Sequence, residues 1–238
     1  MQFGPSAEGR GPWIEIREPT VVTRGITFDV DGTLYSTRAV RLCMGWKNLG
    51  RLRVLRVGLR VREELRGRDF ADAAAMRAEE ARLVGKRTDR NAAAARVALD
   101  DIFDRCLTEC LQRRSHLRTQ LDLEALVALG VKIAVVSDRR VDDKLAAMGL
   151  SALPWGARVS ADETGWLKPS PRPFLHACEA LGLPPDHVVH IGDRIDSDGA
   201  GARAAGMGFV AVDGPQGLEA AIARALDADG RGQRQTSS

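Results

Sequence analysis

Short apolar runs alternate with amphipathic stretches along most of the chain. The apolar runs predict strands at residues 25–28, 131–136, 158–160, 188–191 and 209–212. Helical spacing predicts helices at residues 142–148, 171–181, 199–205 and 217–226. Pro171 suits a first helical turn, and Gly149 and Gly182 suit C-terminal caps. Strands that alternate with helices predict an α/β fold, in which a Rossmann-like parallel sheet carries helices on both faces.

A long helical block interrupts this alternation between the first and second strands. Residues 69–84 are rich in Ala and Glu, and further along apolar residues recur at helical spacing, at Val97, Ile102, Phe103, Leu107 and Leu111. We therefore predict an inserted helical domain over residues 36–118 and an α/β core formed by residues 20–35 and 119–227. The Gly- and Pro-containing residues 1–19 are predicted to form a flexible arm, and the polar residues 228–238 a disordered tail.

Composition and cysteine spacing indicate a globular protein in a reducing compartment. Of the 238 residues, 44% are hydrophobic and 28% are charged, and no apolar run approaches the roughly 18 residues of a membrane span. The N-terminus lacks the apolar stretch of a signal peptide. The four cysteines form no C-x-x-C pair, and Cys106 and Cys110 lie one helical turn apart among apolar residues. We expect reduced thiols and a cytoplasmic location.

Two carboxylates stand where the first predicted strand meets a glycine turn. Asp29 and Asp31 belong to the segment Phe28-Asp29-Val30-Asp31-Gly32-Thr33-Leu34. Residues i and i+2 of an extended chain point to the same side, so both carboxylates can face one site. Burying such groups beside an apolar strand is unfavourable unless a cationic group compensates them. The segment therefore predicts a site for a metal or a phosphate.

Three further pieces follow later strands, or lie in loops that can reach the same sheet edge. Ser137 ends the strand at 131–136, Lys168 precedes a proline, and Asp193 and Asp198 lie in a second acidic cluster after the strand at 188–191. Ligands of an open parallel sheet bind beyond the carboxyl ends of its strands. Alone, Ser137 reads as a turn residue, Lys168 as a surface lysine and Asp193 as a helix N-cap. Their order along the chain favours a shared site.

Taken together, these pieces resemble the phosphatase branch of the haloacid dehalogenase superfamily, over roughly residues 25–212. The resemblance implies that residues 36–118 form a helical cap over the active site and that the enzyme needs Mg²⁺. It implies that Asp29 is the nucleophile, which forms an aspartyl-phosphate, and that Asp31 is the general acid and base. Dehalogenases of the superfamily lack an Asp at the place of Asp31, so its presence favours phosphate chemistry.

The resemblance also implies roles for the remaining site residues. Ser137, Lys168 and Thr33 would bind the phosphoryl group, and Thr33 would also fix the turn beside it. The metal ligands would be the Asp29 side chain, the Asp31 backbone carbonyl and Asp193. Asp198 would act from behind these ligands and orient water or Lys168.

A strongly basic segment lies inside the predicted cap. Residues 38–68 contain ten Lys or Arg residues and two Glu residues, although the net charge of the whole chain is only +3. Leu52, Leu55 and Leu59 can share one helical face beside a face that carries arginines. Three interpretations stay open: a solvated helix, recognition of an anionic substrate, and binding to an anionic membrane surface. Nucleic acid is not expected, because few aromatic residues are interleaved for base stacking.

These observations predict a magnesium-dependent phosphatase that hydrolyses a small phosphate monoester, with a small phosphorylated metabolite as its partner. Two alternatives remain. A phosphomutase of the same superfamily would return the phosphoryl group to a sugar, and a non-catalytic binding or regulatory module would keep the fold without the reaction.

Overall fold

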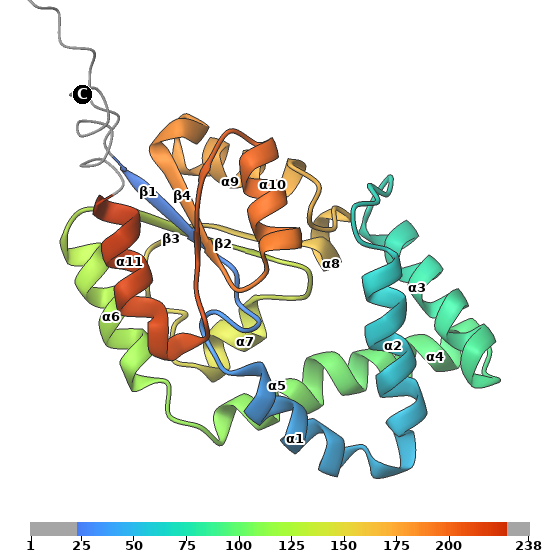
Figure 1. The fold of residues 1–238 in the computed structure, drawn as a ribbon. Coiled ribbons are helices and arrows are strands. Elements are labelled where there is room, and N and C mark those ends of the chain that lie inside the picture. Colours follow the sequence, from blue (N-terminus) through green and yellow to red (C-terminus); the bar gives the residue numbers. More distant parts are fainter. Residues whose placement is uncertain (1–22, 228–238) are drawn as a thin grey trace, which may run out of the picture.

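A five-stranded parallel sheet forms the centre of the computed structural model, which describes residues 23–227 (Figure 1). The strand order is β3-β2-β1-β4-β5. The strands are β1 (Gly25–Phe28), β2 (Lys132–Ser137), β3 (Trp155–Ser160), β4 (Val188–Gly192) and β5 (Gly208–Ala211). Each lies at or within a few residues of a predicted run. β3 begins earlier than predicted because its first residues alternate between exposed and half-buried positions at the sheet edge, rather than forming an apolar run.

Helices cover both faces of the sheet, as predicted. Successive strand residues point to opposite faces, so Ile133 and Val135 of β2 join one apolar cluster whereas Ala134 and Val136 join the other. Apolar side chains of α6, α7 and α11 belong to the first cluster, and those of α9 and α10 to the second. The core helices are α6 (Leu117–Ala128), α7 (Asp142–Ala147), α8 (Ala161–Thr164), α9 (Arg172–Leu181), α10 (Ala200–Ala204) and α11 (Leu218–Asp227).

Five helices inserted between β1 and α6 form what we call the cap. They lie on the side of the sheet toward which β1 runs (Figure 1). Their bounds are α1 (Thr37–Lys47), α2 (Leu52–Glu64), α3 (Ala73–Thr88), α4 (Ala92–Asp100) and α5 (Leu107–Gln112), with a π-helical stretch (Asp101–Cys106) between α4 and α5. The side chains of Asp72 and Asn91 accept hydrogen bonds from backbone amides in the first turns of α3 and α4 and so cap these helices. The predicted arm and tail lie outside the described residues.

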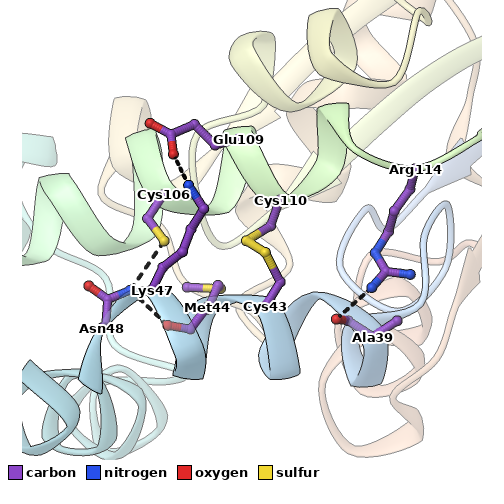
Figure 2. Close-up of a disulfide and its surroundings, with 9 residues drawn as sticks. All are labelled: Ala39, Cys43, Met44, Lys47, Asn48, Cys106, Glu109, Cys110 and Arg114. Atoms are coloured by element: carbon purple, nitrogen blue, oxygen red, sulfur yellow. Dashed lines mark hydrogen bonds and ion pairs between the residues drawn. A yellow bond between two sulfur atoms is a disulfide. The ribbon is translucent and has the colours of Figure 1, made fainter.

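Helix α1 is fastened to α5 along its length, as Figure 2 shows. A disulfide joins Cys43 to Cys110, whose Cα atoms are 5.9 Å apart. The buried side chain of Asn48 donates to Cys106 Sγ over 3.1 Å, and Arg114 donates to the Ala39 carbonyl over 2.9 Å. The two segments that connect the cap to the core are therefore held together as one unit.

The disulfide corrects one expectation from the sequence. Cys106 and Cys110 are buried on a packed helix face, as expected, but Cys110 is oxidised rather than reduced. Its partner Cys43 lies 67 residues away in the chain, and only the packing of α1 on α5 brings the two sulfurs together. A cytoplasmic location stays a prediction, without the support of fully reduced thiols. Within residues 23–227 no helix has the length and apolarity to cross a membrane.

The far end of the cap rests on the core. After α2, the amide of Phe70 donates to the Gly165 carbonyl over 3.2 Å. Near the end of α2, Arg62 pairs with Asp162 at 2.9 Å, and both side chains are buried. The cap thus contacts the core both at the α1–α5 connection and at the end of α2, and it encloses a space between them.

Candidate functional site

The predicted site residues meet between β1 and β4, where the order of the strands in the sheet reverses direction. Phe28 pairs with Ile191 in the parallel register, and the Asp29 amide donates to the Ile191 carbonyl over 2.9 Å. Asp29 and Asp193 therefore leave adjacent strands at the same sheet edge, where ligands of such sheets collect. Gly32 turns the chain between them with a φ of 106°, and a Cβ atom there would lie 2.2 Å from Asp193 Oδ2. Position 32 therefore requires glycine for two reasons: its φ is positive, and a side chain would collide with Asp193.

Lys168 joins the two acidic segments. Its ammonium group donates to Asp29 Oδ1 and to Asp198 Oδ1, each over 2.6 Å, and all three side chains are buried. Burial opposes the charged form of Lys168, but Asp198 and Asp29 together raise its pKa above the usual value. The lysine is therefore a fixed cation that orients the carboxylate of Asp29.

Asp31 is held by two residues that the sequence analysis did not single out. Lys144, a buried lysine on α7, donates to both oxygens of Asp31 over 2.6 and 2.7 Å, and the Tyr35 hydroxyl also donates to Asp31 Oδ1. Burial alone would raise the pKa of Asp31, but Lys144 and Tyr35 lower it below the usual range. Asp31 therefore rests as a carboxylate. No local pattern marks Lys144, because only the folded chain brings α7 beside the loop after β1.

Three carboxylates form a compact group of oxygen donors. Ligand atoms of Asp29, Asp193 and Asp198 all lie within 4.8 Å of one another. Burial raises the pKa of Asp29 well above its usual value, against the effect of Lys168. Asp193 is exposed, but partial desolvation and the nearby Asp198 raise its pKa as well. Counting Asp31, the site holds four carboxyl groups and two ammonium groups, and Asp193 forms an ion pair with neither lysine among the described residues.

The two predicted hydroxyl residues are buried near these groups. The Thr33 hydroxyl lies 3.5 Å from Asp29 Oδ2 and donates to it. Ser137 ends β2, and its hydroxyl oxygen accepts from the Arg139 amide over 3.3 Å. All of Asp29, Asp31, Lys168, Asp193 and Asp198 line one cavity, whereas Ser137 and Thr33 are not part of its wall. The roles assigned to the site residues stay predictions.

Asp138 connects the site to the cap. Its Oδ1 accepts from the Lys168 amide over 3.0 Å, and its Oδ2 pairs with Arg66 at 2.7 Å. Arg66, from just after α2, also donates to Ser197 Oγ over 2.7 Å. An asparagine in place of Asp138 could accept from the Lys168 amide but could not form the ion pair. The acidic side chain thus ties the cap's position to the loop that carries the site lysine.

A buried ionic cluster strengthens the same contact. Arg62 donates to both oxygens of Glu80 over 3.0 and 2.9 Å and to the Asp138 carbonyl over 3.0 Å. Arg139 reaches Glu80 at 3.3 Å and lies over the Phe103 ring, 3.8 Å from its centroid. The acidic partners of Arg62 lie 18 and 100 residues further along the chain. The sequence therefore could not separate this arginine from others in the basic segment.

Comparisons with known proteins agree with this architecture. Residues 23–206 match the family model of haloacid dehalogenase-like hydrolases. The chain is 40% identical over 95 residues to the haloacid dehalogenase-like hydrolase domain-containing protein 3 of Bos taurus, covering 39% of this chain and 38% of the relative. It is 35% identical over 92 residues to a phosphoglycolate phosphatase of Xylella fastidiosa, covering 37% and 39%. The chain thus spans about two fifths of the length of these curated relatives.

A solved structure extends the likeness in fold across most of the chain. β-Phosphoglucomutase from Clostridium difficile superposes with a TM-score of 0.57, covering 86% of this chain and 97% of that one. The sequence identity is 15%, so this likeness concerns the fold alone.

Proposed function

Because the chain belongs to the haloacid dehalogenase-like hydrolase family, we propose that it is a magnesium-dependent phosphatase that hydrolyses a small phosphate monoester through an aspartyl-phosphate on Asp29. The observation that carries the proposal is the bridge of Lys168 between Asp29 and Asp198 at 2.6 Å, beside Asp193 and in the cavity that Asp31 also lines. A fixed cation beside one buried carboxylate, with a second carboxylate for proton transfer, is what nucleophilic phosphoryl transfer needs.

The donor set fits a divalent cation. All the candidate ligand atoms are oxygens, which Mg²⁺ prefers, and the carboxylates outnumber the ammonium groups that pair with them. We expect the Asp29 side chain, the Asp31 backbone carbonyl and Asp193 to hold the ion, with Asp198 behind them. When bound, the ion would neutralise charge on the phosphoryl oxygens. It would also lower the raised pKa values of Asp29 and Asp193.

The remaining steps of the reaction are assigned to side chains of the protein. Asp29 attacks phosphorus and the bond from phosphorus to the alcohol oxygen breaks, with protonated Asp31 giving its proton to that leaving oxygen. Lys168 and the Thr33 hydroxyl keep the Asp29 carboxylate oriented. In the second step Asp31 takes a proton from water, which attacks the aspartyl-phosphate and releases phosphate. The contacts from Lys144 and Tyr35 favour the carboxylate form of Asp31 that this step uses. The protonated form needed for the leaving alcohol is then the minor one, so we expect esters of more acidic alcohols to react faster.

Two other functions would use the same fold. A phosphomutase would transfer the phosphoryl group from Asp29 to a sugar, and isomerised product would reveal it. A non-catalytic binding module would hydrolyse nothing, and the complete set of reactive groups around Asp29 argues against it. A small phosphorylated metabolite is the partner we propose for the site.

The test is hydrolysis of p-nitrophenyl phosphate by the purified chain, with added Mg²⁺ and with a chelator. We expect activity with Mg²⁺, little with the chelator, and none above background for Asp29→Asn in either case. Activity that persists in Asp29→Asn would contradict the assigned nucleophile. If neither this ester nor a panel of metabolite phosphates is hydrolysed, the binding module is the better account.

A further inference from the structure

The space between the cap and the sheet edge has a mostly apolar wall. The cavity has a volume of about 540 Å³, and the carboxylates of the candidate site are part of its lining. Helices α1 and α2 and the stretch around α5 supply the apolar side chains, which are Val40, Met44, Leu52, Leu55, Leu59, Phe103 and Leu107. Cavities of roughly 300–1,000 Å³ bury ligands much larger than a two- or three-carbon phosphate. Such a wall offers a short polar metabolite few partners.

Three of the arginines that line this cavity differ from the paired arginines of the basic segment. Arg41, Arg56 and Arg60 line the cavity, and none forms an ion pair or hydrogen bond with any residue in the described part of the chain. By contrast, Arg51 and Arg62 are paired with acidic groups. Unpaired cations beside an apolar surface attract an anion without filling the apolar space themselves. The unpaired arginines therefore attract an anionic substrate into the cavity, and the apolar part of the wall suits a substrate with an apolar body.

Leu59 is an example of an apolar side chain in this cavity that a ligand could cover. It lines the cavity, and 41% of its surface is exposed. Apolar surface in a concave site contributes binding free energy when a ligand removes it from water. Binding energy from a part of the substrate that does not react can be used to position the reacting part.

We propose that the substrates are amphiphilic phosphate monoesters, with the phosphoryl group at Asp29 and an apolar body of about four to eight carbons against the α1–α2 wall. This inference rests on the proposed phosphatase function and narrows its substrate class. It departs from small polar substrates such as phosphoglycolate, which the name of one relative contains.

The experiment compares n-alkyl phosphates from ethyl to octyl with phosphoglycolate, under the same Mg²⁺ concentration. Alcohols from ethanol to octanol are similar as leaving groups, so chain length changes mainly the contact with the wall. We expect kcat/KM to rise about twofold to fourfold for each added methylene until the cavity is filled. A flat or falling series, with phosphoglycolate the better substrate, would overturn the inference while leaving the phosphatase intact.

Two matched variants test whether the dependence of kcat/KM on chain length comes from the apolar wall. Leu59→Gln should lower the hexyl-to-ethyl ratio of kcat/KM about tenfold. Leu49→Gln, on the same cap but outside the cavity and 61% exposed, should leave that ratio unchanged. Equal ratios in the two variants would contradict the assignment of the wall.

A binding measurement keeps the inference testable apart from turnover. Titration calorimetry of the wild-type protein with ethyl- and hexylphosphonate should show tighter binding of the longer compound by about tenfold or more. Equal affinities would overturn the inference, and no hydrolysis of any phosphate would overturn the proposed function instead.

Discussion

Removing the positive charge of Lys168 should destabilise the folded protein as well as stop the reaction. Methionine keeps most of the volume of the lysine side chain but leaves Asp29 and Asp198 without their shared cation. Lys168 is 3% exposed, and both of its carboxylate contacts are 2.6 Å long. Removing one partner from a buried ion pair costs about 3–5 kcal/mol of unfolding free energy. For a chain of this size we expect the melting temperature to fall by about 6–20 °C.

The pH dependence of this loss has a definite sign. Burial opposes ionisation of Asp198, but Lys168 lowers its pKa, so its stabilising contribution is present at neutral pH and is lost as the pH falls through the folded-state value. Without the lysine the carboxylates take up protons at higher pH. The difference between Lys168→Met and wild type should therefore be largest near neutrality and should shrink as the pH falls and the variant's carboxylates take up protons.

The assay is urea unfolding at several pH values in the presence of a chelator. Lys86→Met is the control, because Lys86 is exposed on α3, and its effect should stay within about 0.5 kcal/mol. Combining Lys168→Met with Asp198→Asn should recover part of the loss, since one unpaired charge is then absent. Added Mg²⁺ should recover a further part. A loss below about 1 kcal/mol for Lys168→Met at neutral pH would refute this electrostatic reasoning.

Three other changes test separate parts of the account. Asp29→Asn should reduce kcat more than about 10³-fold with a far-UV circular dichroism spectrum like that of wild type, and a smaller reduction would contradict its role. Lys144→Met should raise the pKa of Asp31, because its cationic partner is gone; the acidic limb of the kcat profile, which includes hydrolysis of the aspartyl-phosphate, should move to higher pH, and an unmoved limb would count against Asp31 as the base. Replacing Cys43 and Cys110 with serine should cost about 2–5 kcal/mol of unfolding free energy. Wild-type protein in dithiothreitol should then have the same melting temperature as that variant. Different melting temperatures would show that loss of the disulfide is not the cause of the variant's lower stability.

The sequence contained most of the fold and the chemical core of the candidate site. The strands are predictable because buried parallel strands read as continuous apolar runs, as β1 and β4 do. Asp29 and Asp193 are predictable as neighbours because each follows such a strand, and parallel strands end at one edge. Local order along the chain is enough for these inferences.

What the sequence could not supply depends on contacts between distant segments. Lys144 reaches Asp31 across 113 residues, and nothing in its short helix distinguishes it from a surface lysine. The pairing of Cys43 with Cys110 requires the packing of α1 on α5. Likewise, the basic segment divides into paired and unpaired arginines only when α2 is placed against the core. Sequence patterns show which residue types are present, and tertiary contacts show which of them are already satisfied.

The central claim is that Asp29 carries the phosphoryl group during turnover. The most direct measurement is rapid quenching of the wild-type protein with a phosphate ester, followed by borohydride reduction and peptide mapping. Reduction converts an aspartyl-phosphate to homoserine, so we predict homoserine in place of Asp29 and unmodified aspartate at position 31. Homoserine at another aspartate, or phosphate release in a single turnover with no modified residue, would contradict the account.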